Sequence, residues 1–267
     1  MSASGPRPGH GSWRSAVSMF TIIPASGQEP ITPERAARIT LWLPGVGCLL
    51  AVPAAGLYLA VGAGGGSASR TLLGATLAIA TLAALTGGLH LDGLADTADG
   101  LGSRRPRQEA LELMRRPDVG PMGVAALVLT VLVQVTALGA ISPRWLGASA
   151  LAAAVVTSRI AVVMATGLPA ARRDGFGALI AGTTTSKARL TALALVLAVT
   201  GAAGAAAGGA LLAARGLAAV IAGLGAAWWL RRLACRKLGG MTCDVFGALI
   251  EICTATVLLV AAVLHWR

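Results

Sequence analysis

The chain has 267 residues, of which 55% are hydrophobic and 12% are charged, and its formal net charge is +11. Soluble domains carry charge on about a quarter of their residues, so this composition excludes an ordinary soluble domain. The basic excess does not indicate a nucleic-acid partner, because the basic residues alternate with apolar runs instead of forming one patch. The composition therefore predicts an all-α, polytopic membrane protein.

Apolar runs of the length needed to cross a bilayer recur along the chain. A hydrocarbon core about 30 Å thick is crossed by about 20 residues of helix. The sequence predicts a transmembrane helical bundle of about seven spans, or six if the short sixth run does not cross: 39–61, 70–91, 122–141, 145–168, 190–214, 216–230 and 246–265.

The residues before the first span are rich in Gly, Ser and Pro and lack the continuous apolar core of a signal peptide. Residues 1–38 are predicted to be a mobile N-terminal tail and an interfacial segment ending at Pro24. No later polar stretch is long enough for a core of its own. Residues 39–267 are therefore predicted to form a single integral-membrane catalytic domain.

The basic residues also predict the orientation of the chain. With a cytoplasmic N-terminus, most of them lie in inner segments, and the outer segments hold only Arg70, Arg144, Arg215 and Arg267. This is the positive-inside pattern. The longer connections then lie on the inner face, so we expect a multi-pass cell-membrane protein with its active site on the cytoplasmic side.

An acidic stripe follows the second apolar run, in Gly87-Gly88-Leu89-His90-Leu91-Asp92-Gly93-Leu94-Ala95-Asp96-Thr97-Ala98-Asp99-Gly100. In a helix, Asp92, Asp96 and Asp99 share one face over roughly 10 Å. A role as a cap or turn residue explains one aspartate but not three. Their mutual repulsion is relieved by a divalent cation, and hard oxygen ligands suit Mg²⁺.

A second pair of acids, Asp244 and Glu251, lies two helical turns apart at the start of the last apolar run. Asp244 alone would also suit a helix N-terminus. We predict a metal site made by Asp92, Asp96, Asp99, Asp244 and Glu251, and we predict that the four aspartates are catalytic.

Basic residues near these acids are candidates for binding the substrate or cofactor. Guanidinium groups bind phosphate oxygens in a bidentate fork, although a basic loop also suits anionic lipid. Arg159 lies inside a predicted span, where it needs either a phosphate or a salt bridge to an acid. The predicted binding residues are Arg104, Arg105, Arg115, Arg159 and His90, the last having packing as an equal alternative.

Together these residues predict metal-assisted phosphoryl transfer, in which a carboxylate accepts the proton of an attacking hydroxyl. A membrane location suggests a large or membrane-delivered substrate and contact with membrane lipid. A homo-oligomer is compatible with the sequence.

The acidic motif, with Leu113-Met114, Gly120-Pro121-Met122-Gly123 and Gly240-Met241-Thr242 followed by Asp244, resembles the adenosylcobinamide-GDP ribazoletransferase family, also called cobalamin synthase. The resemblance covers most of the chain. It implies a Mg²⁺-dependent enzyme that joins adenosylcobinamide-GDP to α-ribazole or its 5′-phosphate and releases GMP. It also implies that the four aspartates lie at the metal and the diphosphate.

Two other functions remain open at this point. Asp96-Thr97-Ala98-Asp99-Gly100 followed by Arg104 matches the opening of the CDP-alcohol phosphotransferase signature, although Ser103 and Leu113 depart from the rest of it. A membrane transporter could use the acids for cation coupling, but such folds often contain an internal repeat, and none is visible here.

Overall fold

The computed structural model describes residues 10–25, 31–62 and 67–265, and its secondary structure in these ranges is helical. This confirms the predicted all-α class. The helices are α1 (His10–Phe20), α2 (Pro33–Leu41), α3 (Leu43–Gly62), α4 (Ala68–Leu85), α5 (Leu89–Gly102), α6 (Arg107–Leu113), α7 (Pro121–Ala140), α8 (Arg144–Ala165), α9 (Phe176–Ile180), α10 (Ser186–Leu238) and α11 (Cys243–His265).

Within the described ranges, six helical segments are long and apolar enough to cross a membrane: Pro33–Val61, Ala68–Leu85, Pro121–Ala140, Arg144–Ala165, Ser186–Leu238 and Cys243–His265. The chain is therefore a multi-pass membrane protein. The segments Arg144–Ala165 and Cys243–His265 are the most buried of these, so α8 and α11 form the centre of the bundle.

The helix α10 is interrupted at Gly208 and Gly209, whose backbone angles are not helical. Its two arms lie against each other, because a Cβ atom on Gly204 would be 2.6 Å from the Cα atom of Ala213. The predicted boundary between two spans at Arg215 is wrong. The chain reverses earlier, where Gly209 adopts a φ of +74° that side chains disfavour.

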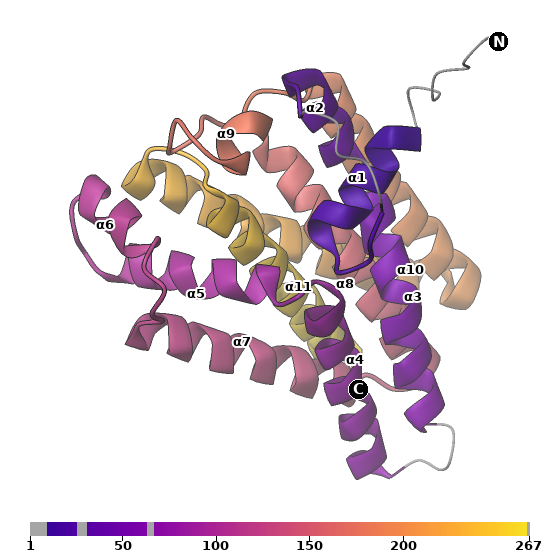
Figure 1. Ribbon diagram of the computed structural model, residues 1–267. Helices are drawn as coiled ribbons and strands as arrows, with labels where there is room; N and C mark the ends of the chain where they lie inside the picture. The colour runs from indigo at the N-terminus through magenta and orange to yellow at the C-terminus, as the bar shows by residue number, and fades with distance from the viewer. Residues whose placement is uncertain (1–9, 26–30, 63–66, 266–267) are drawn as a thin grey trace, which may run out of the picture.

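The predicted span 70–91 is likewise broken, because α4 ends at Leu85 and α5 begins at Leu89. Gly87 and Gly88 have φ values of +59° and +74°, a left-handed conformation that glycine adopts without a steric cost. Figure 1 shows α5 between α7 and α11, and it packs against both. The acidic stripe therefore lies between helices of the bundle and not at the end of a continuous span.

The described part of the N-terminal segment packs against the bundle. Ala16 and Val17 of α1 are buried, and the ring of Trp13 meets that of Trp42 edge to face at 5.3 Å. The amide of Ile22 donates to the carbonyl of Leu85 over 2.8 Å, beside the α4–α5 break. Residues 1–9 and 26–30 of the predicted tail lie outside the described residues, and the domain division at residue 38 stays a prediction.

Candidate functional site at the crossing of α5 and α11

The acidic stripe occupies one helix, as its spacing predicts. Asp92, Asp96 and Asp99 lie on successive turns of α5. Asp92 is exposed, Asp96 is partly buried and Asp99 is buried, so the stripe leads from an open surface into the protein. The three carboxylates are therefore in different environments and are available for different roles.

Asp99 holds the beginning of α7. Its carboxylate accepts hydrogen bonds from the amides of Gly120 at 2.7 Å and Gly123 at 2.9 Å. A Cβ atom on either glycine would lie 2.5 Å from an Asp99 oxygen, which explains both glycines of the Gly120-Pro121-Met122-Gly123 motif. Because free amides at a helix N-terminus attract negative charge, Asp99 stabilises α7 and fixes α5 beside it.

The backbone of α5 closely approaches the start of α11. A Cβ atom on Gly93 would be 2.6 Å from the carbonyl oxygen of Asp244, and one on Gly247 would be 3.1 Å from the carbonyl oxygen of His90. The two glycines let the helix backbones touch, and this contact places Asp244 beside the stripe. Thr242 caps α11 by accepting a hydrogen bond from the amide of Val245 at 3.2 Å.

Arg172 brings a positive charge to this crossing. One guanidinium nitrogen lies 3.5 Å from a carboxylate oxygen of Asp244, and another donates to the carbonyl of Leu111 at 2.7 Å. The loop that carries Arg172 is held by two backbone hydrogen bonds, from Ala171 to Met241 at 2.9 Å and from Met241 to Pro169 at 2.8 Å. The arginine is therefore fixed at the mouth of the acidic cluster.

Arg172 was not among the site residues predicted from the sequence. No local pattern marks it, because its partners Leu111 and Asp244 are far from it in the chain. The resemblance motifs do not include it either.

The carboxylates act on one another electrostatically. The pKa of Asp96 is raised from 3.8 to about 7, mainly because the side chain is partly buried. The negative charges of Asp92, Asp244 and Asp99 raise this pKa further, whereas Arg172 opposes them. The four predicted aspartates are thus close enough to influence one another electrostatically, and Arg172 partly balances their charge.

The chemistry of this donor set fits a hard divalent cation, since it consists of carboxylate oxygens with an excess of negative charge. In the part of the chain that the structure describes, no three His, Cys, Asp or Glu side chains are already arranged to hold a metal ion. A cation would therefore need the aspartate side chains to turn towards one another.

Glu251, Arg159 and His90 line a separate cavity of about 20 Å³, which none of the aspartates lines. Gln134 donates to a carboxylate oxygen of Glu251 at 2.7 Å. Arg159 donates to the carbonyl of Val155 at 3.2 Å and to the hydroxyl of Ser158 at 3.1 Å. The structure does not bring these three residues to the aspartates, and their predicted roles at the metal and substrate stay predictions.

The arginines selected between α5 and α7 lie on the surface. Arg115 is paired with Asp174 at 2.8 Å, and Arg105 lies 3.9 Å from Glu109. Arg104 is exposed and has a φ of +55°, which is uncommon for a residue with a side chain. Their predicted contact with phosphate remains untested by this geometry.

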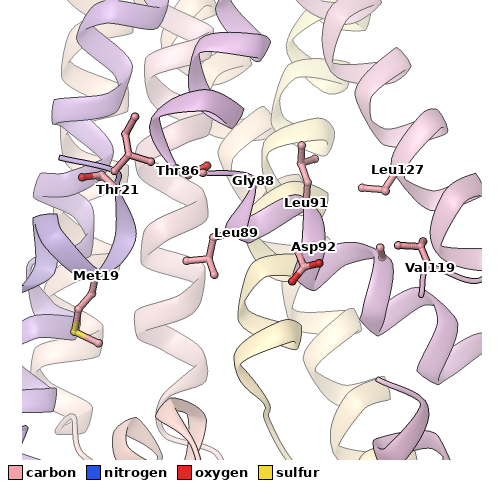
Figure 2. A pocket seen from close by; sticks show the side chains of 12 residues that line it. Met19, Thr21, Thr86, Gly88, Leu89, Leu91, Asp92, Val119 and Leu127 are labelled. Carbon is pink, nitrogen blue, oxygen red and sulfur yellow. The ribbon is translucent and has the colours of Figure 1, made fainter. Parts of the chain in front are cut away.

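A larger pocket, of about 600 Å³, opens at the α4–α5 break, and Asp92 is the only charged residue among the described residues that line it (Figure 2). Its lining is otherwise apolar or uncharged: Met19, Thr21, Ile22, Thr86, Gly87, Gly88, Leu89, Leu91, Ala95, Val119 and Leu127. Asp92 therefore borders both this pocket and the acidic cluster.

Comparison with known proteins identifies the family of the chain. A family model described as CobS, cobalamin-5-phosphate synthase, matches residues 12–262. An adenosylcobinamide-GDP ribazoletransferase from Frankia casuarinae is 39% identical, with 93% of each chain covered. Proteins of the same name from Bradyrhizobium diazoefficiens and Brevibacillus brevis are 39% and 33% identical, covering 93% and 94% of this chain and 92% and 97% of their own.

No solved structure matches the chain. The family model covers nearly the whole sequence, including the acidic stripe of α5 and the start of α11. On this evidence, the chain belongs to the CobS family of cobalamin-5-phosphate synthases.

Proposed function

We propose that this membrane protein joins adenosylcobinamide-GDP to α-ribazole or its 5′-phosphate, releasing GMP, at the crossing of α5 and α11. Its membership of the CobS family and the names of its relatives support this activity. The observation that supports this location is the ion pair of Arg172 with Asp244, next to Asp92 and Asp96, whose charges interact with that of Asp244. The CDP-alcohol phosphotransferase and transporter alternatives have no corresponding support.

We infer that Mg²⁺ is bound by the carboxylates of Asp92, Asp96 and Asp244, which have the oxygen ligands and the uncompensated charge that this ion requires. When bound, it supplies positive charge to the diphosphate and to the departing phosphate. Asp99 adds its charge to the cluster, but both its oxygens are engaged by amides of α7, so we assign it to positioning α5.

The protein's own groups have three tasks in the reaction. Arg172 binds an oxygen of the diphosphate as a charge-assisted hydrogen-bond donor. Asp92 accepts the proton of the attacking ribazole hydroxyl, whose oxygen forms a bond to the phosphorus attached to cobinamide. The bond from that phosphorus to the bridging oxygen breaks, and GMP leaves with the electron pair. The products are the joined corrinoid phosphodiester, GMP and one proton.

We also propose that this site faces the cytoplasm, because most basic residues lie in the connections on the same side as the site. We propose membrane lipid as a partner, which the apolar side chains exposed on the spans support, such as Leu129, 62% exposed, and Leu195, 63% exposed. A homo-oligomer stays a prediction.

The test is release of GMP by the purified protein in detergent, with Mg²⁺ present or chelated. We expect release that requires both adenosylcobinamide-GDP and α-ribazole and that stops when the metal is removed. CDP-diacylglycerol with an alcohol serves as the alternative substrate pair. Turnover of that pair alone, or corrinoid flux across vesicles without GMP release, would contradict the proposal.

A further inference from the structure

The pocket at the α4–α5 break has an uneven distribution of charge. Asp92 stands in its wall, and none of the described residues that line it is basic. Arg172 lies instead beside Asp244, and neither of these residues lines the pocket. A diphosphate needs cationic partners, so this pocket does not suit the phosphates of the donor substrate.

The lining does suit a flat, apolar ring system that carries a few polar atoms. Leu89, Leu91 and Leu127 supply apolar contacts, and the hydroxyl of Thr86 and the backbone of Gly88 lie at the break itself. Figure 2 shows the carboxylate of Asp92 between Leu89 and Val119. Ligand pockets commonly have this composition, with few polar groups on an apolar wall.

The two substrates of the proposed reaction differ in size, and the volume of the pocket can be compared with each. A cavity of about 600 Å³ has the volume of sites that bind small organic molecules. The ribazole unit is a benzimidazole joined to a ribose and is of this size. A corrin ring with its amide side chains and its adenosyl group is several times larger than the ribazole unit, so the pocket matches the smaller substrate.

We propose that the pocket lined by Leu89, Asp92 and Val119 binds the ribazole unit, with its base on the apolar wall and its reacting hydroxyl at Asp92. This inference rests on the proposed function. Gly93, the neighbour of Asp92, touches the backbone of Asp244, so a hydroxyl held at Asp92 borders the acidic cluster. The acceptor hydroxyl then reaches the cluster from the pocket, and Arg172, which pairs with Asp244 and does not line the pocket, is left to bind the diphosphate.

The test uses substitutions that reduce the volume of the pocket and leave the aspartates unchanged. Val119 lines the pocket and is 47% exposed, whereas Val124 does not line it and is 50% exposed. We expect Val119→Trp to weaken binding of α-ribazole to the purified protein at least tenfold and to leave binding of adenosylcobinamide-GDP unchanged. Val124→Trp is the matched control and should change neither affinity.

Leu89→Trp provides a second test from the opposite wall and should have the same effect as Val119→Trp. Both variants are compared with the wild type for monodispersity and thermal unfolding in detergent, so a folding defect is recognised. Unchanged ribazole binding by both folded variants would overturn the proposal. Variants that lose binding of adenosylcobinamide-GDP but keep binding of α-ribazole would also overturn the proposal.

A lipid in the pocket is the remaining outcome. Displacement of a spin-labelled phospholipid by Val119→Trp, with ribazole binding unchanged, would identify a lipid site and overturn the inference. Failure of the proposed function is recognised separately, because the wild-type protein would then release no GMP whatever the behaviour of the pocket variants.

Discussion

The backbone of Gly93 lies so close to that of Asp244 that a Cβ atom on the glycine would be 2.6 Å from the aspartate's carbonyl oxygen. Gly93→Ala must therefore push α5 and α11 apart. We expect this variant to lose about 1–3 kcal/mol of stability through overpacking and to lose most of its GMP release, because Asp92 and Asp244 separate. Thermal unfolding in detergent and the GMP assay measure the two effects.

Gly225→Ala is the matched control, since a Cβ atom on Gly225 meets nothing within 4 Å. Gly225 lies in α10, and this change should preserve activity. The unfolding temperature should equal or slightly exceed that of the wild type, because alanine has a higher helix propensity than glycine. Full activity of Gly93→Ala would show that the close crossing is not needed for the reaction.

Removing the charge of Asp96 tests the acidic cluster directly. Asp96→Asn keeps the shape of the side chain but removes a proposed ligand, so GMP release should fall by about a hundredfold or more. Glu109→Gln is the control, because Glu109 is an exposed acid whose partner is Arg105. Near-normal turnover by a folded Asp96→Asn protein would remove this residue from the site.

The raised pKa of Asp96 predicts a pH dependence of stability when the metal is chelated. In the unfolded chain this carboxyl has its ordinary pKa of 3.8, whereas in the folded protein the pKa is about 7. Between these values the folded state holds the proton more tightly, so the free energy of unfolding falls as pH rises. The chelated protein should unfold at a lower temperature at pH 8 than at pH 5.5.

Added Mg²⁺ should raise the unfolding temperature more at pH 8 than at pH 5.5, because the ion binds the ionised carboxylate. The Asp96→Asn variant should lose most of the pH dependence of its unfolding temperature and most of the additional response to Mg²⁺ at pH 8. An equal response to Mg²⁺ at the two pH values, or an undiminished response in the variant, would contradict the assignment.

Arg172 is predicted to act on the donor substrate. Arg172→Ala removes a charge-assisted hydrogen bond worth about 1.5–3 kcal/mol, so kcat/KM for adenosylcobinamide-GDP should fall at least about tenfold. Arg172→Lys should recover part of this loss, since it restores the charge but not the planar fork. Steady-state measurements with ribazole saturating give the comparison.

Arg115→Ala is the control for this arginine. Arg115 is exposed and paired with Asp174 on the surface, and surface pairs contribute little. Its kcat/KM should stay within about twofold of the wild type. An equal loss in the two alanine variants would instead support the role in phosphate binding that the sequence suggested for Arg115.

Several features of the fold and the site could be read from local patterns. Hydropathy predicted the membrane spans because burial in lipid requires long apolar helices whatever their neighbours. The spacing of Asp92, Asp96 and Asp99 predicted a single acidic face, because helical periodicity is a local property. The break at Gly87 and Gly88 was missed, since the apolar composition continues through it and hydropathy does not register backbone angles.

The sequence by itself determined that this chain crosses a membrane repeatedly, carries an acidic helical face and resembles the CobS family. Only the tertiary structure decided that Arg172 joins Asp244, that Glu251 pairs with Gln134 in another cavity, and that Asp92 borders a pocket. The physical reason is the distance along the chain over which each effect acts. Apolar content and helical spacing act over neighbouring residues, whereas these contacts depend on which helix faces can approach closely, and small residues such as Gly93 and Gly247 allow that approach.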